Sequence, residues 1–454
     1  MVKLNIIVVG STSIGVSLAK ELAEEGHEIT IISEDQNKLH SLQNSLDIRA
    51  ICGKPSYPDI LRAANAEDAD IFIAVTDSDE QNMIACQVAY SLFKVPLKIA
   101  KIRSSHYSVR NELFNDQNLP IDIFINPEQL IAKQVYNLIS NPGVNGIYGL
   151  LNNNINLVII RVTKDTCIIA RHVDDLKNIE IDLPYNLVAV MRNGKYLDLA
   201  SNPMLVIGDE LLIFVSSTNT DGLISGFYKQ NRTDVSKVII VGGGGVGAAA
   251  AAYLDDKGVQ VKIIDHNKHT CEYLAKKFDK ITILEGDASE RALLLDENVE
   301  NVDFFCALTS DDEDNIISSL QAKYLGAKNA ISLVNNNEYK DLFGKSDIDT
   351  LLSPQQSSIS EILTAIRRHD ITKVYTVLCE LSQCIEVSLG KFNASDYAGK
   401  YLSQINIPKA FVFGAIGRGK KAIFDENIML EENDVLILLV PNKKDFVQIY
   451  NILN

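Results

Sequence analysis

A glycine-rich turn followed by a spaced carboxylate is the feature of this sequence best suited to chemistry on a ligand. Gly242, Gly244 and Gly247 form the pattern G-x-G-x-x-G between an apolar β-branched run and an alanine-rich segment, and Asp265 follows. Such a turn lets a pyrophosphate sit on a helix N-terminus, and the carboxylate binds ribose hydroxyls. The pattern predicts a dinucleotide-type site, with a purely structural turn as the alternative.

An altered version of the same pattern lies near the N-terminus. Gly10 and Gly15 keep the outer glycines, but Thr12 occupies the middle position and Ser33 stands where Asp265 stands in the other version. A side chain at residue 12 crowds a phosphate, and a hydroxyl is a neutral anchor for ribose. Two interpretations stay open: a functional first site with a different ligand, or a degenerate scaffold.

Further polar residues match between the two versions. Lys54 takes the place of Asp287, which exchanges a carboxylate for a cation, and Thr76 matches Thr309. Ligands of open parallel sheets bind at the carboxyl ends of strands, where these residues are expected. For Thr76 and Thr309 a role as a helix N-cap is equally compatible with the sequence.

Two cations follow an apolar run in the first version only. Lys101 and Arg103 stand where the second version has Leu333 and Asn335. Both cations are candidates for a phosphate contact, and ordinary surface cations are the alternative.

Both versions belong to a tandem duplication with an offset of about 232 residues. In each copy, short Val/Ile runs alternate with amphipathic segments, at 6–9, 29–32, 71–75 and 97–100, and at 238–241, 261–264, 302–307 and 330–334. This alternation predicts an α/β fold, a doubly wound parallel sheet of Rossmann-like type. Asn126-Pro127 and Ser353-Pro354 each begin one more helix, after which both copies become strand-rich.

The predicted domain order follows from these changes in pattern. It comprises a Rossmann-like domain at 1–140, a smaller α+β domain at 141–217, a polar linker at 218–235, a second Rossmann-like domain at 236–369 and a second α+β domain at 370–454.

Composition excludes several classes of function. With 43 basic and 59 acidic residues the formal charge is −16, so the chain repels nucleic-acid phosphates and no nucleic-acid partner is expected. Seven cysteines without a C-x-x-C pair disfavour a disulfide framework and favour a reducing compartment. The sequence shows neither a signal-peptide pattern nor an apolar run of about 20 residues, so a cytoplasmic location is expected.

Enzymatic alternatives find little support in the residues. His266 and His269 lack a third metal ligand, and Cys379 and Cys384 lack an evident activating base. The Walker pattern for ATP hydrolysis is missing. We therefore expect no catalytic and no metal-binding residues. An NAD-dependent oxidoreductase with duplicated cofactor domains is the alternative function.

At these residues the sequence resembles the RCK (regulator of potassium conductance) family, and its duplicated order resembles the tandem-RCK peripheral subunits of the Trk potassium-uptake system. The most specific matches are Asp68–Ile71, Ala74–Glu80, Gly286–Ser289 and Ser353–Gln356. The resemblance implies a first nucleotide site of Gly10, Ser11, Thr12, Ser13, Ile14, Ser33, Lys54, Thr76, Lys101 and Arg103. It implies a second site of Gly242, Gly243, Gly244, Gly245, Val246, Asp265, Asp287, Ala288 and Thr309.

The resemblance also implies a function. Such proteins bind NAD(H), ATP or ADP and form cytoplasmic rings, here expected to be homotetrameric, under an integral-membrane potassium channel or transporter subunit of the TrkH or TrkG type. Ligand occupancy is converted into gating. In keeping with self-association, the segment 80–93 carries apolar residues around most of a helix, which indicates packing on its own sheet and on another protomer, with burial in one large core as the alternative.

Overall fold

The computed structural model describes residues 3–108, 111–141, 144–164, 166–178, 183–228, 235, 237–336, 339, 348–366, 371–377, 382–389, 398–405, 412–425 and 427–442. The chain forms two compact units, Met1–Leu130 with Gln355–Arg368, and Ile131–Pro354 with His369–Asn454.

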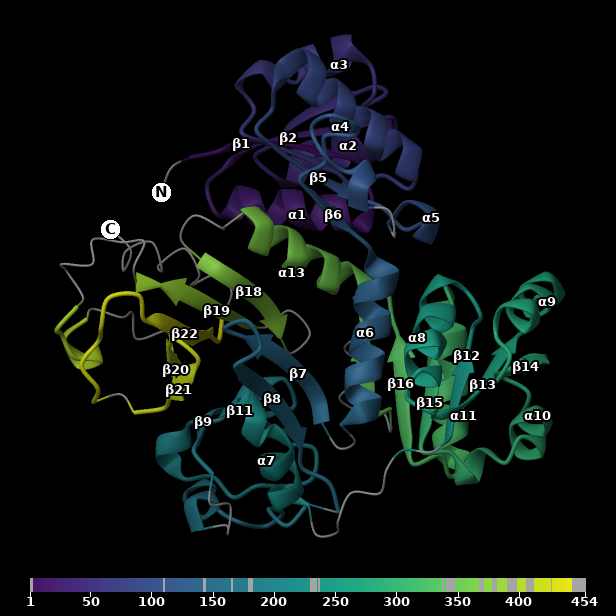
Figure 1. The fold of residues 1–454 in the computed structure, drawn as a ribbon, viewed down its shortest axis with the longest axis vertical. Helices are drawn as coiled ribbons and strands as arrows, with labels where there is room; N and C mark the ends of the chain where they lie inside the picture. Colours follow the sequence, from purple (N-terminus) through teal and green to yellow (C-terminus); the bar gives the residue numbers. More distant parts are fainter. Residues whose placement is uncertain are drawn as a thin grey trace. The chain divides into compact units, whose positions relative to one another are not determined.

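The first unit contains a parallel six-stranded sheet, which with its helices we call N1 (Figure 1). Its strands are β1 (Asn5–Val9), β2 (Glu28–Ser33), β3 (Arg49–Cys52), β4 (Ile71–Ala74), β5 (Leu97–Lys101) and β6 (Ile123–Ile125), in the order β3-β2-β1-β4-β5-β6. Its helices include α1 (Ser13–Glu24), α2 (Gln36–Ser45), α3 (Pro58–Ala63) and α4 (Asp79–Phe93). The strand order reverses between β1 and β4, where doubly wound sheets bind ligands.

The second unit repeats this sheet in a region that we call N2. Its strands are β12 (Lys237–Val241), β13 (Gln260–Asp265), β14 (Thr282–Glu285), β15 (Phe304–Ala307), β16 (Asn329–Leu333) and β17 (Thr350–Leu352), in the order β14-β13-β12-β15-β16-β17. Its helices include α8 (Gly245–Asp255), α9 (Lys268–Lys277), α10 (Arg291–Asp296) and α11 (Asp312–Leu325). The matching orders confirm the predicted duplication of a Rossmann-like fold.

Two antiparallel five-stranded sheets, C1 and C2, also lie in the second unit. C1 has the order β10-β9-β11-β8-β7, with β7 (Val144–Leu150), β8 (Ile155–Arg161), β9 (Tyr185–Arg192), β10 (Lys195–Tyr196) and β11 (Glu210–Ser216). C2 has the order β18-β19-β22-β20-β21, with β18 (Ile371–Val377), β19 (Ser382–Ser388), β20 (Val412–Arg418), β21 (Lys421–Ile423) and β22 (Val435–Val440). The two sheets share one apolar cluster, in which Leu157 and Phe214 of C1 pack with Ile437 of C2.

Part of the expected linker at 218–235 is a helix of C1. Helix α7 (Thr220–Phe227) buries Leu223, Ile224 and Phe227 in the C1 core. These three positions lie on one face of the helix. Their burial stabilises a helix here, although the flanking residues are polar and suggested a linker. Residues 229–234 of the same range lie outside the described residues.

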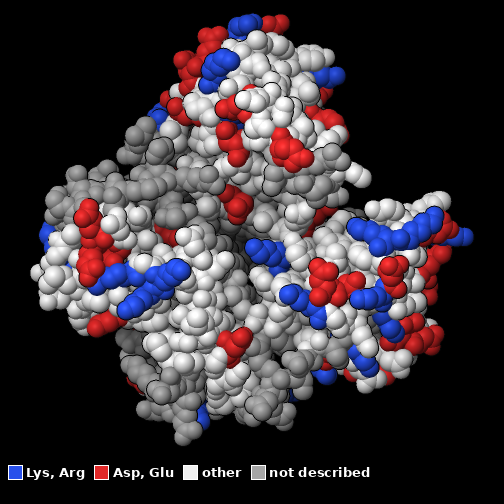
Figure 2. Space-filling model, viewed as in Figure 1, with Lys and Arg blue, Asp and Glu red and all other residues white. Residues whose placement is uncertain are grey.

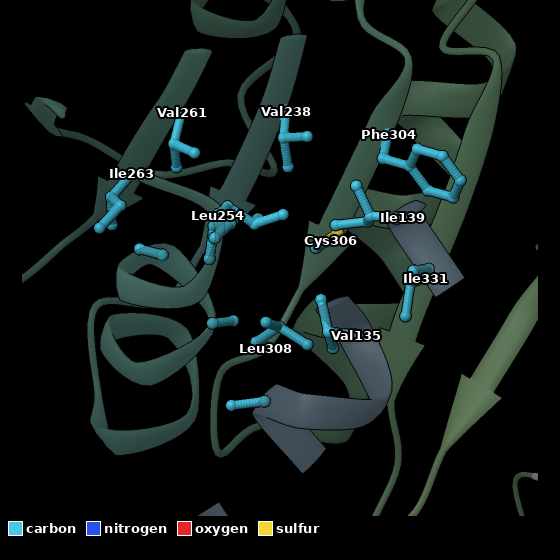
Figure 3. Close-up of a cluster of buried hydrophobic side chains, with 14 of the residues drawn as sticks. Val135, Ile139, Val238, Leu254, Val261, Ile263, Phe304, Cys306, Leu308 and Ile331 are labelled. Atoms are coloured by element: carbon cyan, nitrogen blue, oxygen red, sulfur yellow. The ribbon is translucent and has the colours of Figure 1, made fainter. Parts of the chain in front are cut away.

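The last helix of each Rossmann-like copy packs on the other copy's sheet. Helix α13 (Pro354–Ile366) follows N2 along the chain, yet Ile359 and Leu363 lie in the N1 core with Leu18. Helix α6 (Pro127–Ser140) follows N1, yet from Ile131 onward it packs in the N2 core, where Figure 3 shows Val135 and Ile139 facing strands of N2. The domain boundaries expected at residues 140 and 369 therefore assign each of these helices to a different sheet from the one on which it packs. The exchange resembles domain swapping within one chain.

The described surface is of mixed charge. Figure 2 shows acidic and basic side chains intermingled on the described surface that faces the viewer. Among the helices that the structure describes, none combines the length and apolar character of a membrane span.

Candidate nucleotide-binding sites

The glycine turn of N2 leaves space in which a ligand could approach the backbone closely. Gly242 has φ +94°, and a Cβ there would lie 2.9 Å from the Thr309 nitrogen. A Cβ on Gly247 would lie 1.9 Å from the Gly242 oxygen, so the strand-to-helix contact itself requires glycine. A Cβ on Gly244 would meet no atom within 4 Å. The middle glycine therefore leaves open space over the N-terminus of α8, where an anion is favoured.

One carboxylate contacts this second turn, and another follows the strand β14. Asp265 accepts hydrogen bonds from the Gly243 nitrogen at 2.6 Å and the Asn267 nitrogen at 2.7 Å, which holds its carboxylate against the turn. Asp287 follows β14, and hydrogen bonds with Ser289 hold its pKa below the ordinary value. Ala288 is buried in the N2 core, so only its backbone is suited to meet a ligand.

The first turn has the same backbone but neutral side chains. Gly10 has φ +106°, and a Cβ on Gly15 would lie 2.1 Å from the Gly10 oxygen. Thr12 is the N-cap of α1: its Oγ1 accepts from the Gly15 nitrogen at 3.3 Å and donates to the Val75 oxygen at 2.9 Å. The Thr12 hydroxyl thus ties the turn to the end of β4. Ser13 and Ile14 are the first two residues of α1. The Ser13 side chain is exposed, and the Ile14 side chain is buried.

In N1, Ser33 stands at the position of Asp265 and pairs with the hydroxyl of Ser11 instead of accepting a bond from the turn backbone. Its Oγ lies 2.8 Å from the Ser11 Oγ. The Gly53 nitrogen donates to the Ser33 oxygen at 2.9 Å, which brings the exposed Lys54 into the neighbouring loop. The matched positions are therefore neutral and basic in N1 where they are acidic in N2.

Buried asparagines at both sites were missed by sequence reasoning. Asn82 accepts from the Thr76 nitrogen at 2.9 Å and the Thr76 Oγ1 at 2.7 Å, and donates to the Lys101 oxygen at 2.8 Å. Asn315 makes the same bonds with Thr309 and the Leu333 oxygen. Each asparagine joins the ends of two neighbouring strands. The repeated Thr-x5-Asn spacing was the available signal.

The threonines at these positions are not the helix N-caps. Ser78 caps α4 by accepting from the Gln81 nitrogen at 3.1 Å, and Asp311 caps α11 by accepting from the Asp314 nitrogen at 3.0 Å. Thr76 instead braces the first site through Asn82. Of the two alternatives for Thr76 and Thr309, capping is thereby excluded.

The two cations of the first copy differ in their surroundings. Lys101 is 5% exposed, and its Nζ lies 3.2 Å from the Asp77 Oδ1. Burial lowers the pKa of Lys101, and Asp77 opposes part of that shift. Arg103 is exposed and donates from Nη2 to the Asp77 carbonyl oxygen. Lys101 is thus a buried, paired cation at the end of β5, and Arg103 remains available at the surface beside it.

Of the remaining candidates, His266 directly follows Asp265 and interacts electrostatically with Asp287. His266 and His269 are exposed, and among the described residues no group of three or more His, Cys, Asp and Glu is placed to hold a metal. Burial raises the pKa of the Cys384 thiol well above its ordinary value, which disfavours the thiolate. Cys379 lies outside the described residues.

Two arginines of the small sheets are structural. Arg192 contacts Asp209 with Nε at 2.7 Å and Nη2 at 2.8 Å, and Arg418 contacts Asp434 in the same way at 3.0 and 2.8 Å. Both aspartates are buried. These bidentate pairs hold turns of C1 and C2 in place.

The sheets and their glycine turns define a class: a duplicated Rossmann-like protein in which each copy is followed by a small antiparallel sheet. The family described as "TrkA-N domain" matches residues 6–127 and 238–354. The "Trk system potassium uptake protein TrkA" of Halomonas elongata is 35% identical over 443 residues, covering 97% of this chain and 96% of the relative. The chain belongs to the TrkA family.

Solved structures show the same fold. "Crystal Structure of the GsuK RCK domain" has a TM-score of 0.63 at 18% identity, covering 99% of this chain and 95% of that one. "GsuK channel bound to NAD" has a TM-score of 0.62 at 18% identity, covering 99% and 79%. The RCK-type fold implied by the sequence resemblance is confirmed.

Proposed function

We propose that this protein is a nucleotide-sensing regulatory subunit of a potassium-uptake system. It binds NAD(H) at N1 and N2, with ATP or ADP as further ligands, and couples their occupancy to the gating of an integral-membrane potassium-transport subunit of the TrkH or TrkG type. It acts in the cytoplasm at the inner face of the cell membrane, to which it is attached through that partner. The TrkA family membership and the NAD named for a GsuK relative of the same fold support this proposal.

The open space at Gly244 is the observation that carries the proposal. A glycine there answers no packing need of the protein, because a Cβ would meet nothing within 4 Å. The space lies at the N-cap of α8, and the Asp265 carboxylate is hydrogen-bonded to the neighbouring residue Gly243. Amide donors suit a pyrophosphate and a fixed carboxylate suits a ribose diol, so an adenine dinucleotide matches both.

Exposed apolar side chains support self-association. Ile84 and Leu92 of α4 are 49% and 57% exposed, and Ile317 and Tyr324 of α11 are 54% and 81% exposed. Both helices also bury their opposite faces in their own domains. A homotetrameric ring covers these faces, and such exposed apolar area favours association.

A regulatory role is favoured over the alternative of an NAD-dependent oxidoreductase. Hydride transfer needs an acid or base positioned beside the cofactor. In N2, Asp265 and Asp287 already accept backbone hydrogen bonds, and the exposed His266 interacts electrostatically with Asp287 and Asp314. The family membership favours a ligand that is bound and released unchanged.

Titration of the purified full chain with NADH, NAD, ADP and ATP tests the proposal. Gly244→Leu should remove binding at the second site, because the leucine side chain would occupy the ligand space. The loss of stability should be small, because a Cβ at residue 244 would meet no protein atom within 4 Å. Lys257→Leu, an exposed position beyond the far end of α8, is the matched control and should bind like the parent chain.

Three results would contradict the proposal: no nucleotide binding by the parent chain, unchanged binding by Gly244→Leu, or consumption of NADH with candidate ketones.

A further inference from the structure

A buried glutamine from the second half of the chain contacts the phosphate-side turn of the first site. Gln355, in the first turn of α13, is 7% exposed. Its Nε2 donates to the Ser17 Oγ at 2.6 Å and to the Ser13 oxygen at 3.3 Å. Ser13 is the first residue of α1, directly after the N-cap Thr12. Gln355 therefore braces the end of α1 that faces the ligand space.

Helix α13 is firmly seated at this place. Ile359, Ile362 and Leu363 are buried in one cluster with Leu18 and Leu22 of α1. Figure 1 shows α13 lying alongside α1 beneath the N1 sheet. Because buried apolar contacts hold the helix, the Gln355 amide has little freedom to leave its two acceptors.

The chemistry at this position calls for an amide. A carbonyl oxygen and a hydroxyl face Gln355, and the amide nitrogen supplies a donor to each. An ionised glutamate has no donor, and its charge would compete with a bound phosphate for the positive end of α1. The matching position in the first half is Glu128, which lies near Arg103 and Asp79; burial raises its pKa, and Arg103 opposes that shift.

We propose that Gln355 is a positioning residue of the first nucleotide site, through which the second half of the chain sets the phosphate affinity of N1. Gln355 touches no ligand; it holds the first turn of α1 so that its amides face the phosphates. This inference rests on the proposed function of N1.

The test uses the full chain carrying Gly244→Leu, so that nucleotide binding reports the first site. Gln355→Glu and Gln355→Leu are added to this background, with Glu361→Gln, an exposed change on the same helix, as control. Calorimetric titration with NADH, ADP and adenosine gives the affinities. We expect Gln355→Glu to weaken NADH and ADP binding about tenfold and Gln355→Leu about threefold. Adenosine, which lacks phosphates, should be bound equally by all variants.

Several outcomes would overturn the inference. Parental NADH and ADP affinities in Gln355→Glu would show that the brace has no effect on the site. Equal weakening of adenosine and ADP would show a merely structural role. If the Gly244→Leu chain binds no nucleotide although the parent chain does, N1 is a scaffold and the inference falls, whereas the second site of the proposed function survives. If the parent chain itself binds none, the proposed function fails.

Discussion

The two glycine turns of this chain share a backbone and differ in charge. Both turns begin with a glycine at positive φ and end with a glycine pressed against the first one. Ser33 and Lys54 in N1 stand where N2 has Asp265 and Asp287. The two copies therefore share the scaffold, which depends on sterics, and differ in the side chains that we propose to select a ligand.

This difference predicts different ligand preferences for the two sites. The acidic Asp265 and Asp287 of N2 favour a ribose diol and disfavour additional phosphate charge, as expected for NAD(H) at N2. Neutral and basic residues in N1 tolerate more phosphate charge, as in ADP or ATP. The three predictions below compare matched positions in the two sites.

The largest effect is expected where the two sites are alike. Gly247→Ala places a Cβ 1.9 Å from the Gly242 oxygen, and Gly15→Ala places one 2.1 Å from the Gly10 oxygen. Either change should destabilise its domain by about 3 kcal/mol, because backbone must shift to relieve the overlap. Urea unfolding followed by circular dichroism measures the loss. Gly244→Ala is the control and should unfold like the parent chain; a parental midpoint for Gly247→Ala would contradict the shared requirement.

An intermediate effect is expected where the ribose anchors differ. Asp265→Ser gives the second site the anchor of the first and should weaken NADH binding about tenfold to a hundredfold, because charge-assisted hydrogen bonds are lost. Calorimetric titration with NADH measures the change. Ser33→Ala, at the matched position of N1, should change NADH binding much less. Comparable losses from both substitutions would mean that Asp265 is not a special anchor.

The smallest effect is expected from pH. Hydrogen bonds with Ser289 hold the pKa of Asp287 below the ordinary value of 3.8, so its ionised form stabilises the fold above that pH. The contribution is lost as pH falls through the lower, folded-state pKa. Because the carboxylate is exposed, it should amount to less than about 0.5 kcal/mol.

Urea unfolding of the parent chain and Asp287→Asn between pH 6 and 3 would measure this difference, which should shrink toward the acid end. Lys54→Gln, at the matched position of N1, should leave the stability difference constant over the same range. A gap between parent and Asp287→Asn that widens on acidification would show that the carboxylate is not stabilised by Ser289.

Local patterns predicted much of the fold and the outline of both sites. The apolar runs at 6–9 and 238–241 lie within β1 and β12, and the glycines after them form the expected turns. Hydrophobic periodicity, turn-forming residues and the steric needs of glycine turns depend on residues close together in the chain. They can therefore be recognised from the sequence alone. The short strands β3 and β14 stand out less as apolar runs, because each has two partly buried residues between two exposed ends.

The braces of the sites depended on residues far apart in the chain. Asn82 bonds the end of β5, and Gln355 bonds a helix more than 300 residues earlier. For a polar residue in a helix, the sequence indicates neither whether the side chain is buried nor which group it contacts. Thr-x5-Asn repeats in both copies, but only the contacts show that Asn82 and Asn315 join strands.

By itself the sequence determined the duplication, the Rossmann-like pattern of each copy and the opposite charges at the two turns, because these follow from residue type and local spacing. Tertiary structure alone decided which sheet each terminal helix covers. Both parallel sheets offer similar apolar faces, so the periodicity of α6 and α13 fits either one. Packing of the folded chain resolved that ambiguity by placing α13, with Gln355, on N1 and α6 on N2.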